Sequence, residues 1–440
     1  MRRSRGPAGV MVAVLATVAL AATAGAVPRP PAVPAAASAP PEAPPPPQVV
    51  AGERVVVAQL DPAGGPGDSC AYRPDELLVG SSASADVVAA TVAVTNVLAE
   101  LGVGEVDVSV PSPGTPVALL RLDGTAVDPY AIAAIARARG LAVTPNHVLT
   151  LGTSPRAVGD VEPVDAIDGG LRPAEPGGGG TTVAVVDTGW APDAWTLPTV
   201  VAGATGDVMV GADAGHGTLV AGAIALRAPD ARIISVAPDD LDADYIGPDG
   251  GPPRTITDEV AVLEALADLP EQTVVQLDFG AYPCFRARVG GPRDPLTSVS
   301  PRLIGIEAAI DRLIDRGGLV VVPAGDDATG AERLPAALAA ELAQVVAVGS
   351  LDADGAPSSF SNDFSTVQAV GEHVLSTYPP ELAPSGIARW SSTTLAAACV
   401  TAELARGIST GLQPLDAIAA LQPLLDCGLS LPPAPQDRQD

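Results

Sequence analysis

Lysine is missing from this chain of 440 residues, so its 24 basic residues are all arginines and are outnumbered by 51 acidic residues. The formal net charge is −27 at pH 7. Such a deficit of positive charge argues against nucleic acid and anionic membrane surfaces as partners, and it predicts a self-repelling, soluble surface. Aromatic residues make up only 3% of the chain, which predicts a core of small aliphatic side chains.

Cysteine is also scarce, and the spacings of the four cysteines show no CxxC or Cys/His pattern typical of a metal site. We therefore expect neither a metal nor a cofactor. An even number of cysteines in an exported chain permits two disulfides with three connectivities. One expected pair joins Cys399 to Cys427, and four isolated buried thiols are the alternative. The other two cysteines are Cys70 and Cys284.

Residues 1–26 have the pattern of a secretory signal peptide. Three arginines precede an apolar run at 10–22, and Ala-Gly-Ala follows at 24–26 as a cleavage site. An uncleaved membrane anchor is the alternative, but the apolar run is short for a membrane span. No later stretch is long and apolar enough to cross a bilayer. We therefore expect a secreted protein with no membrane contact after signal cleavage.

Composition divides the rest of the chain. Proline and alanine dominate early, and a Pro/Gly-rich stretch separates two regions with alternating apolar patterns. The predicted segments are a signal peptide at 1–26, a linker at 27–69, a small compact domain at 70–150, a second linker at 151–180, a larger domain at 181–428 and a tail at 429–440.

The small domain is predicted to have the element order βαββαβ, which is typical of a ferredoxin-like fold. Its expected strands are 76–79, 106–110, 117–122 and 141–147, and its expected helices are 83–101 and 128–139.

The larger domain alternates strands with helices, which predicts an α/β fold with a parallel sheet covered by helices on both faces. The expected strands are 181–187, 232–237, 273–279, 319–323 and 344–349. The expected helices are 216–227, 257–268, 303–316, 394–406 and 414–425. A polar loop is expected at 281–301.

Two motifs in this domain carry chemistry. The apolar strand that ends in Val-Asp187-Thr-Gly places a carboxylate at the carboxyl end of a parallel strand, where open α/β sheets bind their ligands. The second motif, His216-Gly-Thr-Leu-Val-Ala-Gly, places an imidazole between glycines at the start of a buried helix, which suits proton transfer.

Together these motifs resemble the subtilase (subtilisin-like serine peptidase) family, and the order of acid, base and nucleophile is that of subtilisin. The third family motif, Gly-Thr-Ser-x-Ala-Ala-Pro, corresponds to Ser392-Thr-Thr394-Leu-Ala-Ala-Ala398. The resemblance implies a subtilisin-like fold. It implies that Asp187 orients the imidazole, that His216 is the base and that Thr394 stands in the place of the nucleophilic serine.

The same resemblance shows departures at the positions that matter for catalysis. The methyl group of Thr394 stiffens its side chain and crowds a site fitted to serine. Asp326 stands where the family has an asparagine that donates to the oxyanion, and an ionised carboxylate there opposes the developing charge. On the strand Val274–Gly280, which resembles the substrate-binding strand, Asp278 replaces a serine and Gly280 is retained.

The resemblance also implies that residues 70–150 act as a propeptide, whose carboxy-terminal tail lies in the cleft and is cut within the following linker. The four glycines at 177–180 are equally well explained as slack between domains.

Three functions follow. The favoured one is a secreted pseudopeptidase that retains a cleft for a peptide or protein ligand, including its own propeptide-like domain. The second is an active endopeptidase that uses Thr394, His216 and Asp187. The third, of another class, is a non-catalytic surface or partner-binding protein with a vestigial cleft.

Overall fold

The computed structural model describes residues 48–49, 56–59, 69–81, 86–123, 129–152, 161–165, 171–194, 201–203, 206–246, 253–282, 302–330 and 332–421. The predicted signal peptide, the carboxy-terminal tail, Cys284, Cys427 and most of the loop 281–301 lie outside these residues. Cys399 is disulfide-bonded, and its pairing with Cys427 stays a prediction.

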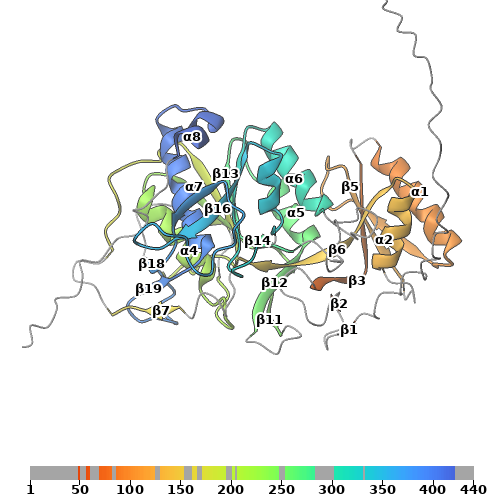
Figure 1. The fold of residues 1–440 in the computed structure, drawn as a ribbon, viewed down its shortest axis with the longest axis horizontal. Helices are drawn as coiled ribbons and strands as arrows, with labels where there is room; N and C mark the ends of the chain where they lie inside the picture. Colours follow the sequence, from red (N-terminus) through yellow and green to blue (C-terminus); the bar gives the residue numbers. More distant parts are fainter. Residues whose placement is uncertain are drawn as a thin grey trace, which may run out of the picture. The chain divides into compact units, whose positions relative to one another are not determined.

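The larger domain is built on a parallel sheet of seven strands (Figure 1), as the alternating pattern predicts. All pairings between its strands are parallel. In spatial order the strands are β17 (Val367–Val370), β16 (Val345–Leu351), β15 (Leu319–Pro323), β13 (Val274–Leu277), β8 (Thr182–Val186), β10 (Arg232–Val236) and β9 (Val201–Gly203).

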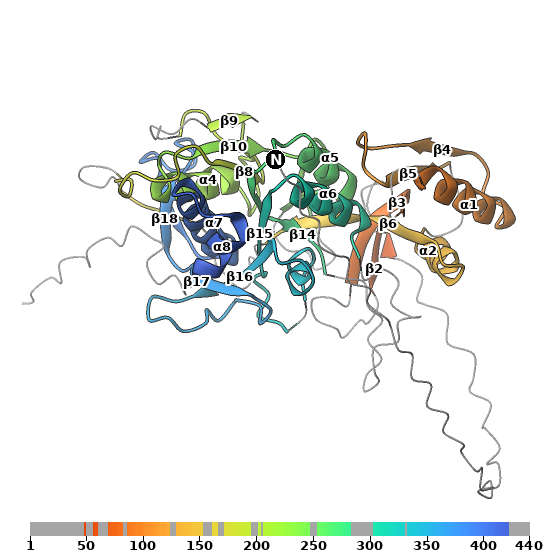
Figure 2. The same ribbon diagram turned by 90° about the horizontal axis from the view of Figure 1, so that it is seen from above.

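Helices cover both faces of this sheet because neighbouring strand residues point to opposite sides. Val183 and Val185 belong to one apolar cluster, and Ala184 and Val186 belong to another. In Figure 2, α4, α7 and α8 lie on one side of β8 and β15, and α5 and α6 lie on the other. These helices are α4 (His216–Arg227), α5 (Glu259–Ala267), α6 (Ile304–Asp315), α7 (Thr393–Ser409) and α8 (Pro414–Ala420).

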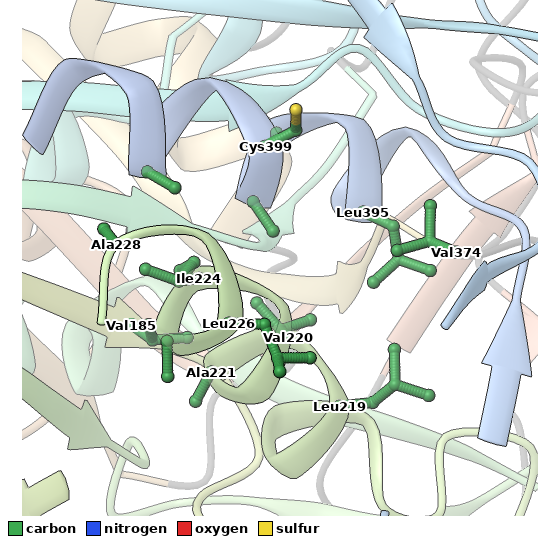
Figure 3. Packing of buried hydrophobic residues seen from close by; sticks show 14 of the residues in the cluster. Val185, Leu219, Val220, Ala221, Ile224, Leu226, Ala228, Val374, Leu395 and Cys399 are labelled. Carbon is green, nitrogen blue, oxygen red and sulfur yellow. The ribbon is translucent and has the colours of Figure 1, made fainter. Parts of the chain in front are cut away.

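The helices that carry His216 and Thr394 pack directly on each other (Figure 3). Leu219 and Ile224 of α4 are fully buried, and Leu395 of α7 is buried in the same apolar cluster. This packing fixes the starts of α4 and α7 relative to the sheet, and with them the two site residues.

The small domain has the predicted element order βαββαβ. Its elements are β3 (Ser69–Gly80), α1 (Val87–Glu100), β4 (Val106–Ser109), β5 (Val117–Leu122), α2 (Pro129–Ala138) and β6 (Ala142–Leu151). Two short strands, β1 (Gln48–Val49) and β2 (Val56–Gln59), extend its sheet beyond β3. The core of this domain is a third apolar cluster, formed by Val94, Leu98, Ile132 and neighbouring residues.

Strand β6 is longer than expected, and it leaves the small domain to pair with two strands of the larger one. It pairs antiparallel with β12 (Arg254–Asp258) and with β14 (Phe279–Gly280). Strand β11 (Asp242–Tyr245) lies beyond β12 in the same sheet. Figure 1 shows β6 running from beside α2 toward β14. One sheet therefore includes strands from both domains.

Several boundaries differ from the sequence prediction. Helix α5 begins at Glu259 rather than at 257, because residues 254–258 form β12 and the carboxylate of Asp258 caps the helix by accepting from the amide of Ala261 at 3.0 Å. The single strand expected at 273–279 is split into β13 and β14 at Asp278. Strands β9, β11 and β17 were not expected because each is short, and β12 was not expected because its sequence, Arg-Thr-Ile-Thr-Asp, has only one aliphatic residue.

Two further short elements complete the larger domain. Strands β18 (Val374–Thr377) and β19 (Ile387–Trp390) form an antiparallel sheet with β7 (Glu162–Pro163), which lies within the predicted second linker. A 3-10 helix, η1, spans Ala336–Ala340.

Within the described part of the chain, no helix combines the length and the hydropathy that a membrane crossing requires.

Candidate active site

Asp187 and His216 form a close, buried pair. Asp187 follows β8, at the carboxyl end of a central strand, and His216 is the first residue of α4. The imidazole Nδ1 lies 2.8 Å from both carboxylate oxygens of Asp187, and neither side chain is exposed to solvent. The ring of Trp390 meets His216 edge-on, with centroids 5.1 Å apart. The sequence-predicted acid and base are thus brought together.

The charge state of this pair follows from its surroundings. Burial opposes a charged imidazole, but the charge and hydrogen bond of Asp187 outweigh burial and raise the pKa of His216 to about 9. Burial likewise disfavours the Asp187 carboxylate, yet the nearby imidazolium holds the pKa of Asp187 below its usual value. At neutral pH His216 is therefore a cation and carries the proton that a general base must be free to accept.

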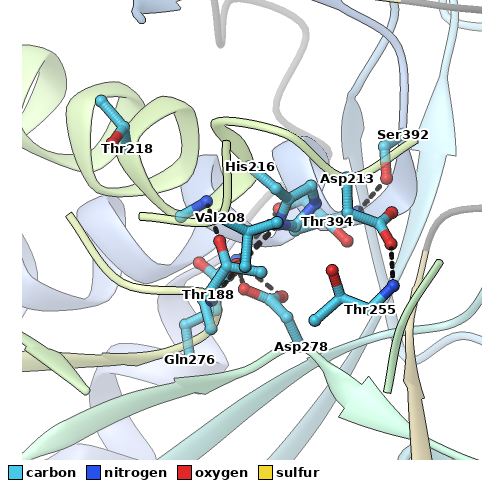
Figure 4. A network of polar contacts seen from close by, with 12 residues as sticks. Thr188, Val208, Asp213, His216, Thr218, Thr255, Gln276, Asp278, Ser392 and Thr394 are labelled. Atoms are coloured by element: carbon cyan, nitrogen blue, oxygen red, sulfur yellow. Dashed lines mark hydrogen bonds and ion pairs between the residues drawn. The ribbon is translucent and has the colours of Figure 1, made fainter. Parts of the chain in front are cut away.

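Thr394 lies in the first turn of α7, close to His216 in Figure 4. Its side chain is fully buried, and its Oγ1 has no hydrogen-bond partner among the described residues. The Nε2 atom of His216 is also buried without a partner there. The structure thus brings the third predicted residue to the site, but without the hydrogen bond between base and hydroxyl that activates a nucleophile.

The position where an oxyanion would be stabilised is filled by acceptors. Asp326, which follows β15, is fully buried and accepts hydrogen bonds from the hydroxyl of Ser392 at 2.7 Å and from the amide of Thr393 at 2.8 Å. Ser392 is the N-cap of α7, and its Oγ accepts from the amide of Thr394 at 2.9 Å. The backbone amides at the start of α7 are therefore already engaged.

Burial raises the pKa of Asp326 to about 7, while the hydrogen bonds from Thr393 and Ser392 partly oppose the shift. A protonated Asp326 could donate to an oxyanion, but only below about pH 7. Neutral His216 requires a pH above about 9. Because the pKa of Asp326 lies below that of His216, no pH makes both groups predominantly neutral.

Asp278 lies between β13 and β14 and is fully buried beside the pair. Gln276 Nε2 donates to both of its carboxyl oxygens, at 3.0 and 3.1 Å, and to the carbonyl of Thr394 at 3.1 Å. Burial, together with the charge and the hydrogen bond of Asp187, raises the pKa of Asp278 well above its usual range. This shift favours the protonated form of Asp278, in which its carboxyl can donate to Asp187.

The cleft beside Thr394 contains the end of β6. Leu151 pairs with Phe279, and Thr150 pairs with both Gly280 and Ile256. The predicted residue Gly280 thus lies on a strand edge that holds an extended peptide segment. At the end of that segment, the Cα of Gly152 faces Thr394, so that an added Cβ would lie 2.9 Å from Oγ1.

Other residues contribute to the site but belong to no motif that could be recognised in the sequence. Asp207 accepts from the amide of Thr218 at 2.8 Å at the start of α4, and burial raises its pKa to about 6. Arg333 donates to the carbonyl of Thr150 at 2.5 Å. Among the residues that the motifs missed, only the role of Ser392 could have been predicted, because serine before an apolar run predicts an N-cap. Among the described residues no cluster of His, Cys, Asp and Glu could hold a metal ion.

Comparisons with known proteins agree with the fold of the larger domain. The sequence profile of the Subtilase family matches residues 178–414, and no curated protein matches the chain. Fervidolysin from Fervidobacterium pennivorans, a keratinolytic enzyme related to subtilisin, has a similar structure, with a TM-score of 0.52 and 20% identity over 78% of this chain and 56% of that chain. This chain thus spans little more than half the length of fervidolysin. A cold adapted subtilisin-like serine proteinase is 21% identical over 56% of this chain and 82% of that chain, with a TM-score of 0.40.

Proposed function

Since this chain belongs to the subtilase family of peptidases, we propose that it is a catalytically impaired member, a pseudopeptidase, whose peptide-binding cleft holds the chain's own β6. The observation that carries the proposal is the position of Asp326. A carboxylate takes the place of an oxyanion donor, and it binds the hydroxyl of Ser392 and the amide of Thr393.

Loss of an oxyanion donor strongly slows acyl transfer. In subtilisin, removal of one oxyanion donor lowers kcat by about 100- to 1,000-fold. Here the amide of Thr394 is also taken, by the Ser392 side chain. The imidazole adds a second obstacle, because its pKa of about 9 leaves little neutral base at physiological pH. Efficient peptide hydrolysis is not expected from this arrangement.

Peptide binding, in contrast, is supported by the backbone. The edges of β12 and β14 face each other across β6 and pair with it on both sides. Main-chain pairing of this kind recognises an extended peptide largely independently of its side chains. We propose that residues 70–150 act as a propeptide-like domain that stays bound, and that the protein is exported by its first 26 residues.

A gain-of-function variant tests the proposal. Thr394→Ser with Asp326→Asn restores the residue types of an active subtilase, and Ser392→Gly added to this pair frees the amide of Thr394. We expect the triple variant to cut its own chain within residues 151–180, and its His216→Ala version to stay whole. If the triple variant stays uncut although folded, the cleft does not present its peptide for hydrolysis, and a non-catalytic partner-binding protein becomes the better account.

One observation favours an active threonine peptidase as the second candidate. The Asp187–His216 pair retains a 2.8 Å geometry that a vestigial site does not need. Under this alternative a fluorophosphonate probe would label Thr394 of the natural protein at alkaline pH, where His216 loses its proton. The impaired-enzyme proposal expects no labelling between pH 6 and pH 10.

A further inference from the structure

Gly152 lies where a bound peptide meets Thr394, and the space around it admits no side chain. An added Cβ would lie 2.9 Å from Thr394 Oγ1 and 3.0 Å from the Cγ of Pro323, the last residue of β15. Contacts below about 3.0 Å force a shift of the neighbouring atoms, and a proline ring held in a central strand cannot move readily.

The backbone conformation does not explain this glycine. Positive φ angles occur at many other glycines of the described chain, but Gly152 is not among them. Any residue could therefore adopt its conformation. The requirement for glycine at position 152 comes from space alone.

The neighbouring space, between β14 and the loop at 324–327, is filled by three side chains that we call the plug: Tyr282, Arg333 and Asn362. The hydroxyl of Tyr282 donates to Asp327 at 2.5 Å and accepts from Asn362 at 2.7 Å. Asn362 also donates to the carbonyl of Ala324 at 2.9 Å. The plug surrounds Gly325, because a Cβ added to this glycine would meet Asn362, Arg333 and Tyr282. A side chain at position 325 would therefore meet the plug.

Arg333 of the plug also holds the bound backbone. Its side chain is buried, and its guanidinium donates to the carbonyls of Thr150 and Gly280, at 2.5 and 3.2 Å. One carbonyl belongs to the bound strand and the other to β14. Arg333 therefore recognises a main-chain atom two residues before the glycine.

We infer that this cleft selects an extended peptide with glycine at the position that faces Thr394, that Pro323 and Thr394 determine this selectivity, and that Arg333 of the plug holds the peptide main chain. The inference deepens the proposed function and rests on it, because it takes β6 as the ligand of the cleft. The ligand class is a peptide strand recognised by its main chain, with glycine at the position that faces Thr394.

Hydrogen exchange in the full chain tests the inference. In the natural protein the amides of Leu149 to Leu151 and of Gly280 should be protected. Gly152→Val should raise their exchange rates at least tenfold, because the added methyl groups overlap Pro323 and Thr394. Gly104→Val is the matched control, since nothing lies within 4 Å of a Cβ at that position. Its rates should equal those of the natural chain.

A rescue variant separates loss of fit from loss of folding. Gly152→Ala should also increase exchange, and Gly152→Ala combined with Pro323→Ala and Thr394→Ala should restore protection, because the atoms that oppose the Cβ are removed. Natural protection in Gly152→Val, or no restoration in the rescue variant, would overturn glycine selectivity while β6 remains in the cleft. Rapid exchange of β6 in the natural protein would overturn the proposed function itself, and the selectivity with it.

Discussion

At the residue scale, the site concentrates acidic groups where water is excluded. Asp187, Asp278 and Asp326 are all fully buried, and one cation, His216, lies among them. Burial raises the pKa values of Asp278 and Asp326, so these carboxyls keep a proton to a higher pH, and the pKa of His216 is also raised. The shift of His216 moves the imidazole away from the neutral state that a general base requires, whereas the shift of Asp326 favours a protonated carboxyl that could donate to an oxyanion, but only below about pH 7.

The pKa of His216 is directly measurable, because the chain has only three histidines. An NMR titration of the imidazole should give a midpoint near pH 9. In Asp187→Asn the midpoint should fall to 6.5 or lower, since burial then acts with less opposition. Glutamine substitutions at His147 and His373 assign the three signals. A midpoint near 6.5 in the natural protein would contradict the proposed ion pair.

Asp326 predicts a pH-dependent stability. Because burial raises its folded pKa from 3.8 to about 7, the folded state holds a proton that the unfolded state releases. Its contribution to stability is therefore greatest below pH 3.8, falls as the pH rises to about 7 and stays low above that. Asp326→Asn should raise the free energy of unfolding at pH 8 by roughly 1–3 kcal/mol and change it little at pH 4.

Thermal unfolding at both pH values checks this prediction. The exposed Asp363 on a nearby loop provides a matched Asp→Asn control that should leave the stability unchanged. An equal effect of Asp326→Asn at pH 4 and pH 8 would mean that ionisation of Asp326 is not the cause.

At the element scale, the attachment of β3 to the larger domain depends on a buried ion pair. Arg73 donates to Asp258 at 2.9 Å and also pairs with Asp240. Asp258 in turn caps α5. Arg73 of the small domain therefore contacts the residue that caps α5 of the larger domain, and this contact is shielded from water.

Loss of Arg73 should leave Asp258 buried without its partner. Arg73→Ala is expected to lower the free energy of unfolding by about 3–5 kcal/mol. Arg121→Ala is the matched control, because Arg121 is half exposed in its pair with Glu76, and it should cost less than about 1 kcal/mol. Denaturant unfolding gives both values, and equal losses would show that burial of the Arg73 pair adds nothing.

The sequence predicted those elements whose patterns are long or carry a motif. Helix α4 begins and ends where its apolar run and His216 motif predict, and β8, β10 and β15 agree within a residue or two. Strand β12 was missed although it is as long as β8, because its sequence Arg-Thr-Ile-Thr-Asp has only one aliphatic residue. The separation of β14 from β13 was missed because two residues show no periodicity, and the pairing of both strands with β6 joins segments far apart in sequence.

The same distinction holds for the candidate site. Motifs placed Asp187, His216, Thr394, Asp326 and Asp278 in one region, and the structure brings these residues together. The role of Ser392 in occupying an amide depends on its side-chain rotamer, and the fit of Gly152 depends on Pro323 from a distant strand. Neither follows from spacing along the chain.

At the scale of the whole molecule, the described domains share a continuous sheet, in which β3 and β6 of one lie beside β12 and β11 of the other. The bound segment meets the buried hydroxyl of Thr394 at Gly152, so a working site would act first on its own chain. The central claim is that it does not.

Intact mass of the purified natural protein tests this claim most directly, measured beside Thr394→Ala and His216→Ala versions. The account predicts one mass for all three apart from the substitutions, with residues 70–150 still joined to the larger domain after any signal peptide is removed. Loss of the region before about residue 180 in the natural chain alone, and in neither variant, would contradict it and establish a working threonine peptidase.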